Sequence, residues 1–555
     1  MTAHPGQVTY RNEPRPRGDR PPEAGRSRPA RAVAGLRTHW AAAVLLAAGA
    51  VLRGLALAAY HPALLYPDTL KYLSGAWPGA DPMGYAVILR VILAGGDLGT
   101  VVLIQHVAGL AIGLAIYLVV LRAGAGRTLA AVAMAPVLLD AYQVQIEQMI
   151  MPDVWFEVLA VAGLAALAWT TAPSWRRLAA AGLLLGASAI VRQIGEALLL
   201  PALVYLIVLA GGWRRVARST AALCAAFALP VLVYCGIAYL RTGQFRLSDQ
   251  GSIAGRAAAA ADCATLRLPA DLRPFCPSAR QQRYGPDWLT HSSRSPLKRA
   301  PVPPGRTRGA LISAFDSAVE QQQPERIIGA VLRDSLLVFA PVKTGVPGTT
   351  PIARWQFQVR FPRFRPEIST GPGGVIELGV QKSAAAPFRQ LALPAGDGGP
   401  ARVDHQVAAL LRGYQLAGGY TPGPVLALFT LAGLAGALIA VLGPVLTRAG
   451  TRRPRRGRGA DPPSGPPADR VPGTGTGVLP VAAVSLLFLL AGGAVLLVSD
   501  LFEFSWRYQL PALITLPVAG AAGARALWLA GARRRAGQRP FSARLPTAGS
   551  SRSAP

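Results

Sequence analysis

Ionisable residues interrupt the apolar stretches of this sequence in two segments. Residues 146–156, IEQMIMPDVWF, carry Glu147 and Asp153 between two apolar runs. Residues 66–73, YPDTLKYL, carry Asp68 just after the first apolar run. A charged group at membrane depth is costly, so it usually faces protein or water and marks a functional path. If both segments reach the same membrane face, their carboxylates can belong to one catalytic site.

The composition predicts a membrane protein. Of the 555 residues, 52% are hydrophobic and only 15% are charged, and the mean hydropathy of +0.34 is too high for an ordinary soluble chain. Several windows of about 20 residues, the length that crosses a bilayer core, carry almost no charge. The sequence therefore predicts an all-α polytopic membrane protein with about ten transmembrane helices. The predicted spans are residues 38–60, 100–121, 128–144, 153–171, 178–193, 196–212, 219–240, 422–446, 477–499 and 510–531.

The net charge of +30 suggests nucleic acid as a partner, but the distribution of the charge argues against it. The arginines concentrate in the tails, 1–37 and 532–555, which we expect to be disordered, and in the linker 447–476. Basic flanks of apolar runs mark the cytoplasmic side and meet membrane lipid. We therefore expect a multi-pass protein of the cell membrane with both termini in the cytoplasm. The acidic segments then face outside.

A long polar segment separates two groups of spans. Residues 38–240 form an N-terminal transmembrane module, and residues 422–531 contain the C-terminal helices. Between spans seven and eight, residues 241–421 form an extracytoplasmic segment rich in Pro, Arg and Gly. We expect this segment to be of mixed structure, with a helix over 314–340 that is broken near Pro324.

The cysteines predict a disulfide rather than a metal site. Cys263 and Cys276 lie in the polar segment, close enough in sequence to pair if that segment is outside the cytoplasm. Cys224 and Cys235 lie in an apolar run and are expected to be small core residues. No CxxC pair is present, so a zinc site is not expected. The sequence assigns no cofactor, and a divalent metal remains an open alternative.

Two arginines complete a possible site. Arg192 and Gln193 lie at the end of the fifth span, and Arg507 and Tyr508 lie between the last two spans. Arginine binds phosphate through a planar fork of hydrogen bonds, and a carboxylate can accept the proton of an attacking hydroxyl. These residue types at the outer face suit the transfer of a sugar from a polyprenyl-phosphate donor to a hydroxyl.

The order of these motifs resembles the GT-C superfamily of polytopic glycosyltransferases that use lipid-linked sugars. The resemblance is closest to bacterial relatives of protein O-mannosyltransferases and aminoarabinose transferases, and it is strongest over residues 40–240. It rests on YPDTLKYL, DPMGYAVILRVI, QIEQMIMPDVWFE, LLLGASAIVRQIGEALLLPAL and, at residues 505–517, SWRYQLPALITLP. Many members carry two adjacent acids in the first loop, whereas Thr69 follows Asp68 here.

The resemblance implies a role for each candidate residue. Asp68 would be the catalytic base, and Asp153, with Glu147 nearby, would assist the acceptor, the base or a metal. Arg192 and Arg507 would bind the lipid-linked phosphate. We add their neighbours to the predicted substrate-binding residues, which are Arg192, Gln193, Tyr72, Arg507 and Tyr508. The acceptor would be a cell-envelope glycan, lipid or protein, and the Arg-, Ala- and Gly-rich composition suggests a bacterial source.

Purely structural roles compete with these assignments. Asp68 and Asp153 could cap helices, and Arg192 could pair with Glu196 one turn away. Arg507 could anchor the membrane interface beside aromatic residues, and His106 could be a packed or hydrogen-bonded core histidine. At the level of function, the alternatives are a transporter or flippase of lipid-linked sugar and a non-catalytic cell-envelope scaffold.

Overall fold

The computed structural model describes residues 37–74, 81–209, 212–248, 253–363, 368–370, 376–380, 389–392, 399–450 and 477–537. Nearly all of the two predicted tails and of the predicted linker 447–476 lie outside the described residues. The described part is mostly helical. The prediction of a largely α-helical fold is therefore confirmed.

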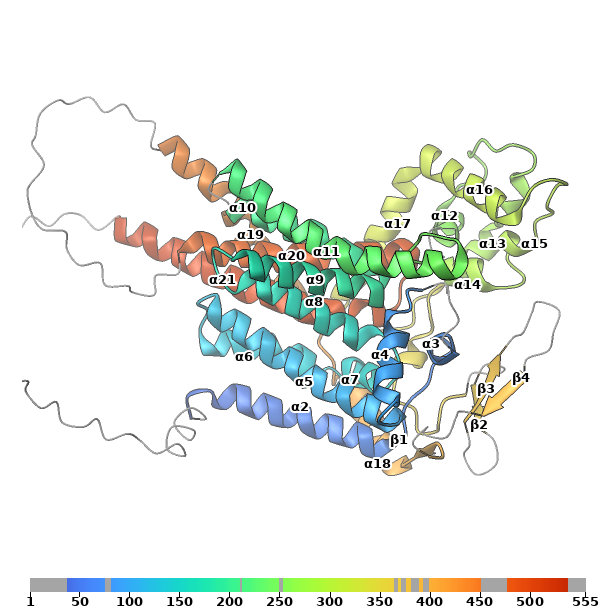
Figure 1. The fold of residues 1–555 in the computed structure, drawn as a ribbon, viewed down its shortest axis with the longest axis horizontal. Helices are drawn as coiled ribbons and strands as arrows, with labels where there is room; N and C mark the ends of the chain where they lie inside the picture. Colours follow the sequence, from blue (N-terminus) through green and yellow to red (C-terminus); the bar gives the residue numbers. More distant parts are fainter. Residues whose placement is uncertain are drawn as a thin grey trace, which may run out of the picture.

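Long apolar helices lie side by side in one bundle (Figure 1). Within the described residues, six helices are long and apolar enough to cross a membrane. They belong to α2 (Trp40–Ala59), α5 (Leu98–Arg122), α11 (Trp213–Thr242), α19 (Gly423–Gly450), α20 (Val478–Phe502) and α21 (Pro511–Gly537), the last together with the preceding turn η6 (Trp506–Gln509). The count rises to seven if α6 (Arg127–Leu139) and α7 (Ala141–Glu147), which are bent by 55° at Asp140, form one broken span.

Three shorter helices occupy the places of the remaining predicted spans. They are α8 (Asp153–Ala168), α9 (Trp175–Val191) and α10 (Leu199–Leu209), which follows the turn η1 (Gln193–Leu198). Each is shorter than the roughly 20 residues that cross a bilayer core. All three pack inside the bundle, with α8 against α9, α9 against α11 and α10 against α20. The total of ten spans therefore stays a prediction.

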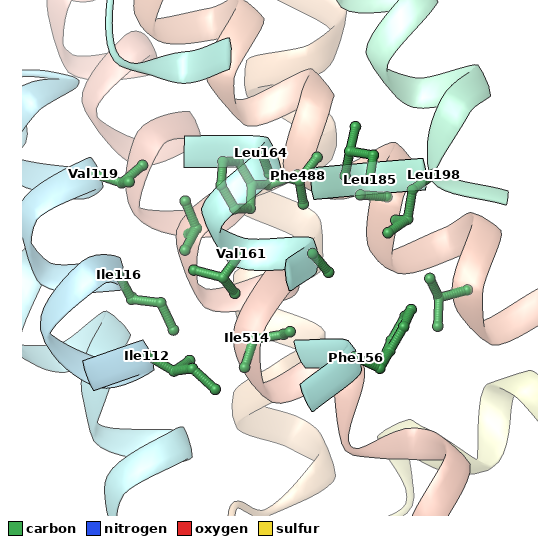
Figure 2. Close-up of a cluster of buried hydrophobic side chains, with 14 of the residues drawn as sticks. Ile112, Ile116, Val119, Phe156, Val161, Leu164, Leu185, Leu198, Phe488 and Ile514 are labelled. Carbon is green, nitrogen blue, oxygen red and sulfur yellow. The ribbon is translucent and has the colours of Figure 1, made fainter. Parts of the chain in front are cut away.

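Close helix contacts shape the bundle core. A Cβ atom on Gly182 or Gly186 of α9 would overlap a backbone carbonyl oxygen of α11, so these glycines let two helices approach closely. In the bundle core, Figure 2 shows an apolar cluster contributed by α5, α8, α9, α20 and α21. Its members include Ile112, Phe156, Leu185, Phe488 and Ile514. Packing of this kind fixes where the ends of the helices lie.

Much of the inserted segment forms a helical lobe at one end of the bundle (Figure 1). Its main helices are α12 (Ala254–Ala260), α14 (Gly285–His291), α16 (Arg308–Gln322) and α17 (Pro324–Leu336), with the short α13 (Ala279–Gln282) and α15 (Pro296–Arg299) between them. They surround a separate apolar core that contains Phe275 and Phe315. The predicted break at Pro324 is present, because this proline begins α17. The predicted helix starts earlier than expected, at Arg308.

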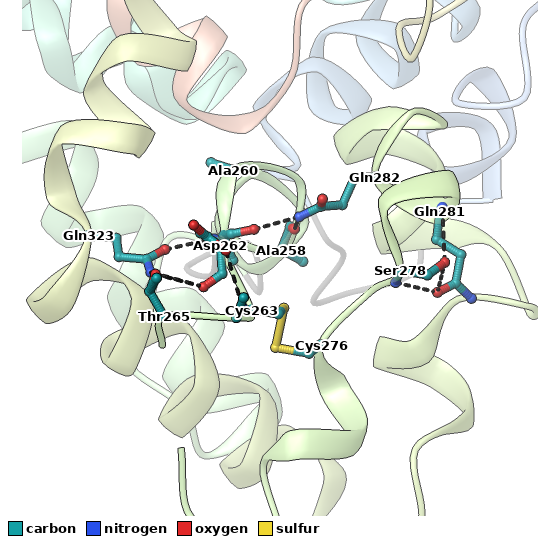
Figure 3. The surroundings of a disulfide bond; sticks show 12 residues. Ala258, Ala260, Asp262, Cys263, Thr265, Cys276, Ser278, Gln281, Gln282 and Gln323 are labelled. Carbon is teal, nitrogen blue, oxygen red and sulfur yellow. Dashed lines mark hydrogen bonds between the residues drawn. A yellow bond between two sulfur atoms is a disulfide. The ribbon is translucent and has the colours of Figure 1, made fainter. Parts of the chain in front are cut away.

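A disulfide joins Cys263 to Cys276 in this lobe, with 5.9 Å between their Cα atoms. Figure 3 shows it beside Asp262, whose backbone N–H donates to Gln323 Oε1 over 2.8 Å. Gln323 lies between α16 and α17, so the cystine loop is tied to the helix pair. Cys224 and Cys235 are free thiols.

Short strands complete the mixed inserted segment. The strands β2 (Ile368–Thr370), β3 (Ile376–Val380) and β4 (Arg389–Ala392) form an antiparallel sheet in the order β2-β3-β4. A second ladder pairs β1 (Tyr60–His61) with β5 (Arg402–Val403), and α18 (His405–Leu416) follows it. The second ladder ties the inserted segment to the end of α2.

The segments that carry the predicted site residues share one end of the bundle. The α2-to-α5 connection with α3 (Thr69–Ser74) and α4 (Gly84–Leu93), the turn after α7, the end of α9 and the turn before α21 all lie at the end that carries the lobe (Figure 1). The arginine-rich connections after α5 and α8 lie at the opposite end. This separation is the arrangement that the positive-inside rule requires.

Candidate active site

The first acidic segment is held against the second by backbone hydrogen bonds. The N–H of Leu64 donates to Gln148 O over 2.9 Å, and the N–H of Ile150 donates to Leu64 O over 3.1 Å. The Thr69 hydroxyl adds a bond of 3.0 Å to Ile150 O. Thr69 is thus a buried link between the two segments, and it fixes the position of the preceding Asp68.

The second acidic residue is positioned by a helix start. Pro152 is the N-cap of α8, and Asp153 is its first residue. A carboxylate in the first turn of a helix is favourable because that end carries partial positive charge. The carboxylate of Asp153, however, is directed at two guanidinium groups, so its main contacts are with charged side chains rather than with the helix end.

Four of the predicted residues contact one another directly. Arg507 Nε lies 2.9 and 3.0 Å from the two carboxylate oxygens of Asp153, and Arg507 Nη1 lies 3.3 Å from Asp68 Oδ2. Arg192 Nη1 donates to Asp153 Oδ1 over 2.5 Å. We call Asp68, Asp153, Arg192 and Arg507 the open cluster. It brings together the end of α9, the turn η6 before α21, the start of α8 and the first loop.

The members of the open cluster differ in exposure. The side chain of Asp68 is 34% exposed, whereas those of Asp153 and Arg507 are only 3% and 5% exposed. Partial burial would raise the pKa of Asp68, but Lys71 and Arg507 outweigh it and hold the pKa below its ordinary value. Asp68 is therefore ionised at neutral pH, and it is the carboxylate of the cluster that a ligand can reach.

Donor groups of both arginines remain for a ligand. Among the described residues, the hydrogen bonds of Arg192 use only Nη1, and those of Arg507 use only Nε and Nη1. The ring of Tyr508 lies 5.2 and 5.4 Å from the two guanidinium carbons, within the range of cation–π attraction. The structural alternative for Arg192, a pair with Glu196, is replaced by its contact with Asp153.

Two other predicted binding residues lie at the margin. Tyr72 is buried edge-on against Tyr85, with ring centroids 5.1 Å apart, and Lys71 lies 5.2 Å from its ring. Gln193 accepts a hydrogen bond of 2.5 Å from the Ser248 hydroxyl. Within the described contacts neither side chain bonds to the carboxylates of the open cluster.

Glu147, predicted to act beside Asp153, belongs to a different cluster. It is fully buried, and its carboxylate lies 2.6 Å from Arg53 Nη2, 3.0 Å from His106 Nδ1 and 3.3 Å from Gln143 Nε2. Gln143 also donates to Glu157 over 2.7 Å. We call Arg53, His106, Gln143, Glu147 and Glu157 the closed cluster. Since its groups bond one another away from solvent, the structure does not support Glu147 as a catalytic residue.

The sequence did not indicate a contribution from the inserted segment. Residues 340–358, here called the strap, bring Trp355 to 5.5 Å from the Arg507 guanidinium and 5.0 Å from the Tyr66 ring. Arg354 Nη1 donates to the Tyr66 hydroxyl over 2.9 Å. The indole Nε1 of Trp355 is buried and has no hydrogen-bond partner among the described residues. The only sequence signal was an Arg-Trp pair in a long polar segment.

The strap is anchored on both sides of Trp355. Lys343 lies 4.6 Å from the ring of Tyr142, and Trp506 Nε1 donates to Thr344 O over 2.8 Å. Beyond Trp355, the Gln415 amide bonds to Trp355 O over 3.1 Å and to Phe357 N over 2.8 Å. Burial lowers the pKa of Lys343, opposed by its attraction to Asp140. The strap is therefore fixed in place and does not hang freely over the site.

A neighbouring carboxyl group links the lobe to Tyr508. Glu503 has its pKa raised to about 8 by burial and by the nearby Asp287 of α14, while a hydrogen bond with Tyr508 opposes the rise. The pKa of Glu503 is thus shifted upward, whereas that of Asp68 is shifted downward. In the described part of the chain, no group of three or more His, Cys, Asp or Glu residues is arranged to hold a metal ion.

Comparisons with known proteins add little. No protein-family model matches the sequence, and no curated protein matches it. One solved structure with a partial likeness is that of the S. cerevisiae protein O-mannosyltransferase Pmt1-Pmt2 complex bound to the sugar donor. The likeness has 16% identity and a TM-score of 0.29, and it covers 40% of this chain and 36% of that chain. At this level the likeness supports no inference about function, which has to come from the site itself.

Proposed function

We propose that this protein is a membrane glycosyltransferase of GT-C type, with the open cluster as its active site. It would transfer a sugar from a polyprenyl-phosphate donor to a hydroxyl of a cell-envelope acceptor, at the outer face of the cell membrane. The observation that carries the proposal is the Arg507 guanidinium bridging Asp153 and the half-exposed Asp68. This arrangement places a carboxylate base, Asp68, in direct contact with the fixed positive charge of Arg507.

Each group has a definite part in the proposed reaction. The acceptor oxygen forms a bond to the anomeric carbon as the bond from that carbon to the phosphate oxygen breaks. Asp68 takes the acceptor proton, and the electron pair of the broken bond leaves with the polyprenyl phosphate. The polyprenyl phosphate is a good leaving group that departs as an anion, so it needs charge stabilisation rather than a proton. Arg192 and Arg507 provide that positive charge.

Asp153 acts as a positioning residue in this proposal. It binds both guanidinium groups at once and holds them at the site without contacting the reacting atoms. Trp355 and Tyr508 stack against the same guanidinium of Arg507 and limit its rotation. A pre-positioned cation loses little energy by reorganisation when charge develops on the phosphate.

The decisive experiment is a transfer assay on purified protein in lipid nanodiscs. The donors are radiolabelled polyprenyl-phosphate mannose, glucose and arabinose, supplied with a cell-envelope extract as acceptor. Asp68→Asn should lower transfer about 10²- to 10⁴-fold because it removes the base. Asp271→Asn is the matched control, because Asp271 lies in the lobe and pairs with Arg306 at 3.6 Å.

Two results would contradict the proposal. The first is wild-type protein that transfers sugar from none of the donors, and the second is Asp68→Asn protein that transfers as fast as the control. Movement of intact labelled lipid across the bilayer without transfer would instead support the transporter alternative. Within the described part of the chain, the bent α6–α7 pair is compatible with that alternative.

A further inference from the structure

Helix α17 of the lobe carries two adjacent apolar faces. Its Ile327 and Val331 are buried in the core of the lobe. The other apolar face carries Ile328, Leu332 and Leu336, whose side chains are 57%, 48% and 63% exposed. Residues four apart lie on the same side of a helix, so these three form one continuous exposed row, here called the α17 stripe.

The C-terminal end of α17 is fixed at the level where membrane spans end. The hydroxyl of Ser335 donates to Asp500 Oδ2 over 2.8 Å, and Asp500 lies in the last turn of the span α20. The turn η3 (Leu337–Phe339) that follows α17 packs on the start of α19. There Gly423 allows the contact, because a Cβ atom on it would overlap Phe339.

The direction of α17 suits a helix that lies along a membrane surface. In the view of Figure 1, α17 runs across the direction of the long bundle helices rather than along it. An amphipathic helix in the membrane interface has this orientation, with its apolar face about 5–10 Å below the headgroup boundary.

The surroundings of the stripe indicate what covers it. Near η3, the first turns of α19 expose Leu428 and Leu431, as expected for a helix that faces lipid. Leu336, the last residue of the stripe, is followed directly by η3, which packs on α19, so the stripe ends close to this apolar surface. Arg333, next to Leu332, is exposed at the edge of the stripe and can reach lipid phosphates. Glu325, at the end of α17 away from the bundle, is exposed and leaves the apolar surface there.

We propose that the α17 stripe is a lipid-docking surface, through which the lobe rests on the outer leaflet of the membrane that the bundle crosses. Ile328, Leu332 and Leu336 enter the boundary between headgroups and acyl chains. The stripe and Ser335 then attach the lobe to the membrane and to the bundle at the same level. This inference depends on the membrane bundle alone and holds whether or not the protein transfers sugars.

The test measures the depth of single labelled positions. In protein with Cys224→Ala and Cys235→Ala, and with the disulfide intact, Leu332→Cys or Leu336→Cys is labelled with the fluorophore bimane. The matched control is Val302→Cys, since Val302 is an exposed apolar residue between α15 and α16. All variants are placed in nanodiscs of phosphatidylethanolamine and phosphatidylglycerol, with or without bromine on the acyl chains.

The proposal expects a shorter emission wavelength and loss of fluorescence by brominated lipid at positions 332 and 336, with neither effect at 302. Equal emission and no quenching at all three positions would overturn it, because the stripe would then lie in water. That result is expected if the stripe binds a protein partner that the nanodisc lacks. Crosslinking of Leu332→Cys between two copies, without quenching by lipid, would overturn it in favour of a dimer interface. Variants are compared only after their elution volume and disulfide mass match those of the parent protein.

Discussion

Two carboxylate–guanidinium clusters lie at the same end of the bundle, and they differ in how far their carboxylates are exposed. In the closed cluster, Glu147 bonds Arg53, His106 and Gln143, and all four side chains are buried. In the open cluster, Arg507 joins a buried carboxylate, Asp153, to one that is a third exposed.

The difference separates a structural role from a chemical one. A carboxylate whose oxygens are already bonded in a dry interior cannot accept a proton from a substrate without losing those bonds. A partly exposed carboxylate beside fixed cations can accept that proton, because the substrate displaces water from it and no protein contact has to break. Buried carboxylate–guanidinium pairs hold helices together, and removal of one partner leaves an uncompensated charge. The same pair of residue types therefore gives opposite expectations in the two clusters.

The largest expected effect is on stability and concerns the closed cluster. Glu147→Ala should destabilise the protein by about 3–5 kcal/mol, since it leaves Arg53 buried without a counter-ion. The double variant Arg53→Met with Glu147→Leu should recover most of this loss. Thermal unfolding in nanodiscs measures both. A stable Glu147→Ala protein that fails only in sugar transfer would show that Glu147 is catalytic and that the distinction between the clusters is wrong.

A smaller effect is expected at the strap. Trp355→Ala removes the ring that stacks on Arg507, an interaction of about 0.5–2 kcal/mol, so kcat/KM for transfer should fall about 2- to 30-fold. Trp355→Phe keeps an aromatic face and should retain most of the activity. Equal rates for Trp355→Ala and wild type would exclude the strap from the site, whereas equal losses for both variants would point to the indole N–H instead of the ring.

The smallest effect is a shift in pH dependence. Asp68 must be ionised to act as a base, so transfer is lost as the pH falls through its folded-state pKa, which lies below the ordinary value. The stabilising contribution of its ion pairs is present above the unfolded-state pKa and is lost over the same fall. Lys71→Met removes one of the two lowering cations and should move the acid limb of the pH–rate profile upward.

The control for this shift is Asp81→Asn. Asp81 is the other carboxylate that pairs with Lys71, so its removal leaves the Lys71–Asp68 attraction in place. The acid limb of the Asp81→Asn variant should not move upward. An unchanged acid limb in Lys71→Met would mean that Asp68 does not limit the rate at low pH.

Much of the architecture follows from the sequence because its signals are local. Apolar length indicates the long helices. Pro324 predicts the break between α16 and α17, since proline lacks the N–H that an interior helix position uses and is favoured in the first turn of a helix. The common end of the acidic loops follows from counting spans and basic flanks. The number of spans follows less directly from the sequence at the short helices α8 to α10. Their place in the bundle depends on tertiary packing rather than on apolar length.

The site is only partly readable from the sequence because it depends on contacts between distant residues. Glu147 and Asp153 have the same charge in one short segment and both are buried, so only their partners separate them: Glu147 pairs with Arg53, whereas Asp153 pairs with the arginines of the open cluster. Trp355 reaches Arg507 from a polar segment in which no periodicity or acidic neighbour marks it. The position of Trp355 depends on how the strap is anchored. The anchoring contacts join residues that are far apart in the sequence, so no local sequence pattern predicts them.

In the proposed mechanism, the open cluster binds a lipid phosphate through its arginines and uses Asp68 only for chemistry. The most direct test is the binding of decaprenyl phosphate, with decaprenol as the uncharged control, to purified wild-type, Arg192→Ala and Asp68→Asn proteins. Native mass spectrometry at several lipid concentrations gives each Kd, and the two variants separate anion binding from proton transfer.

The account predicts that the wild type prefers the phosphate over decaprenol and that Arg192→Ala weakens phosphate binding about 10- to 100-fold, the loss of one charge-assisted hydrogen-bonded contact. Asp68→Asn should bind at least as tightly as wild type, because it removes a negative charge beside Arg507, while losing transfer. Equal binding of the two lipids by the wild type, or loss of phosphate binding in Asp68→Asn, would contradict the account.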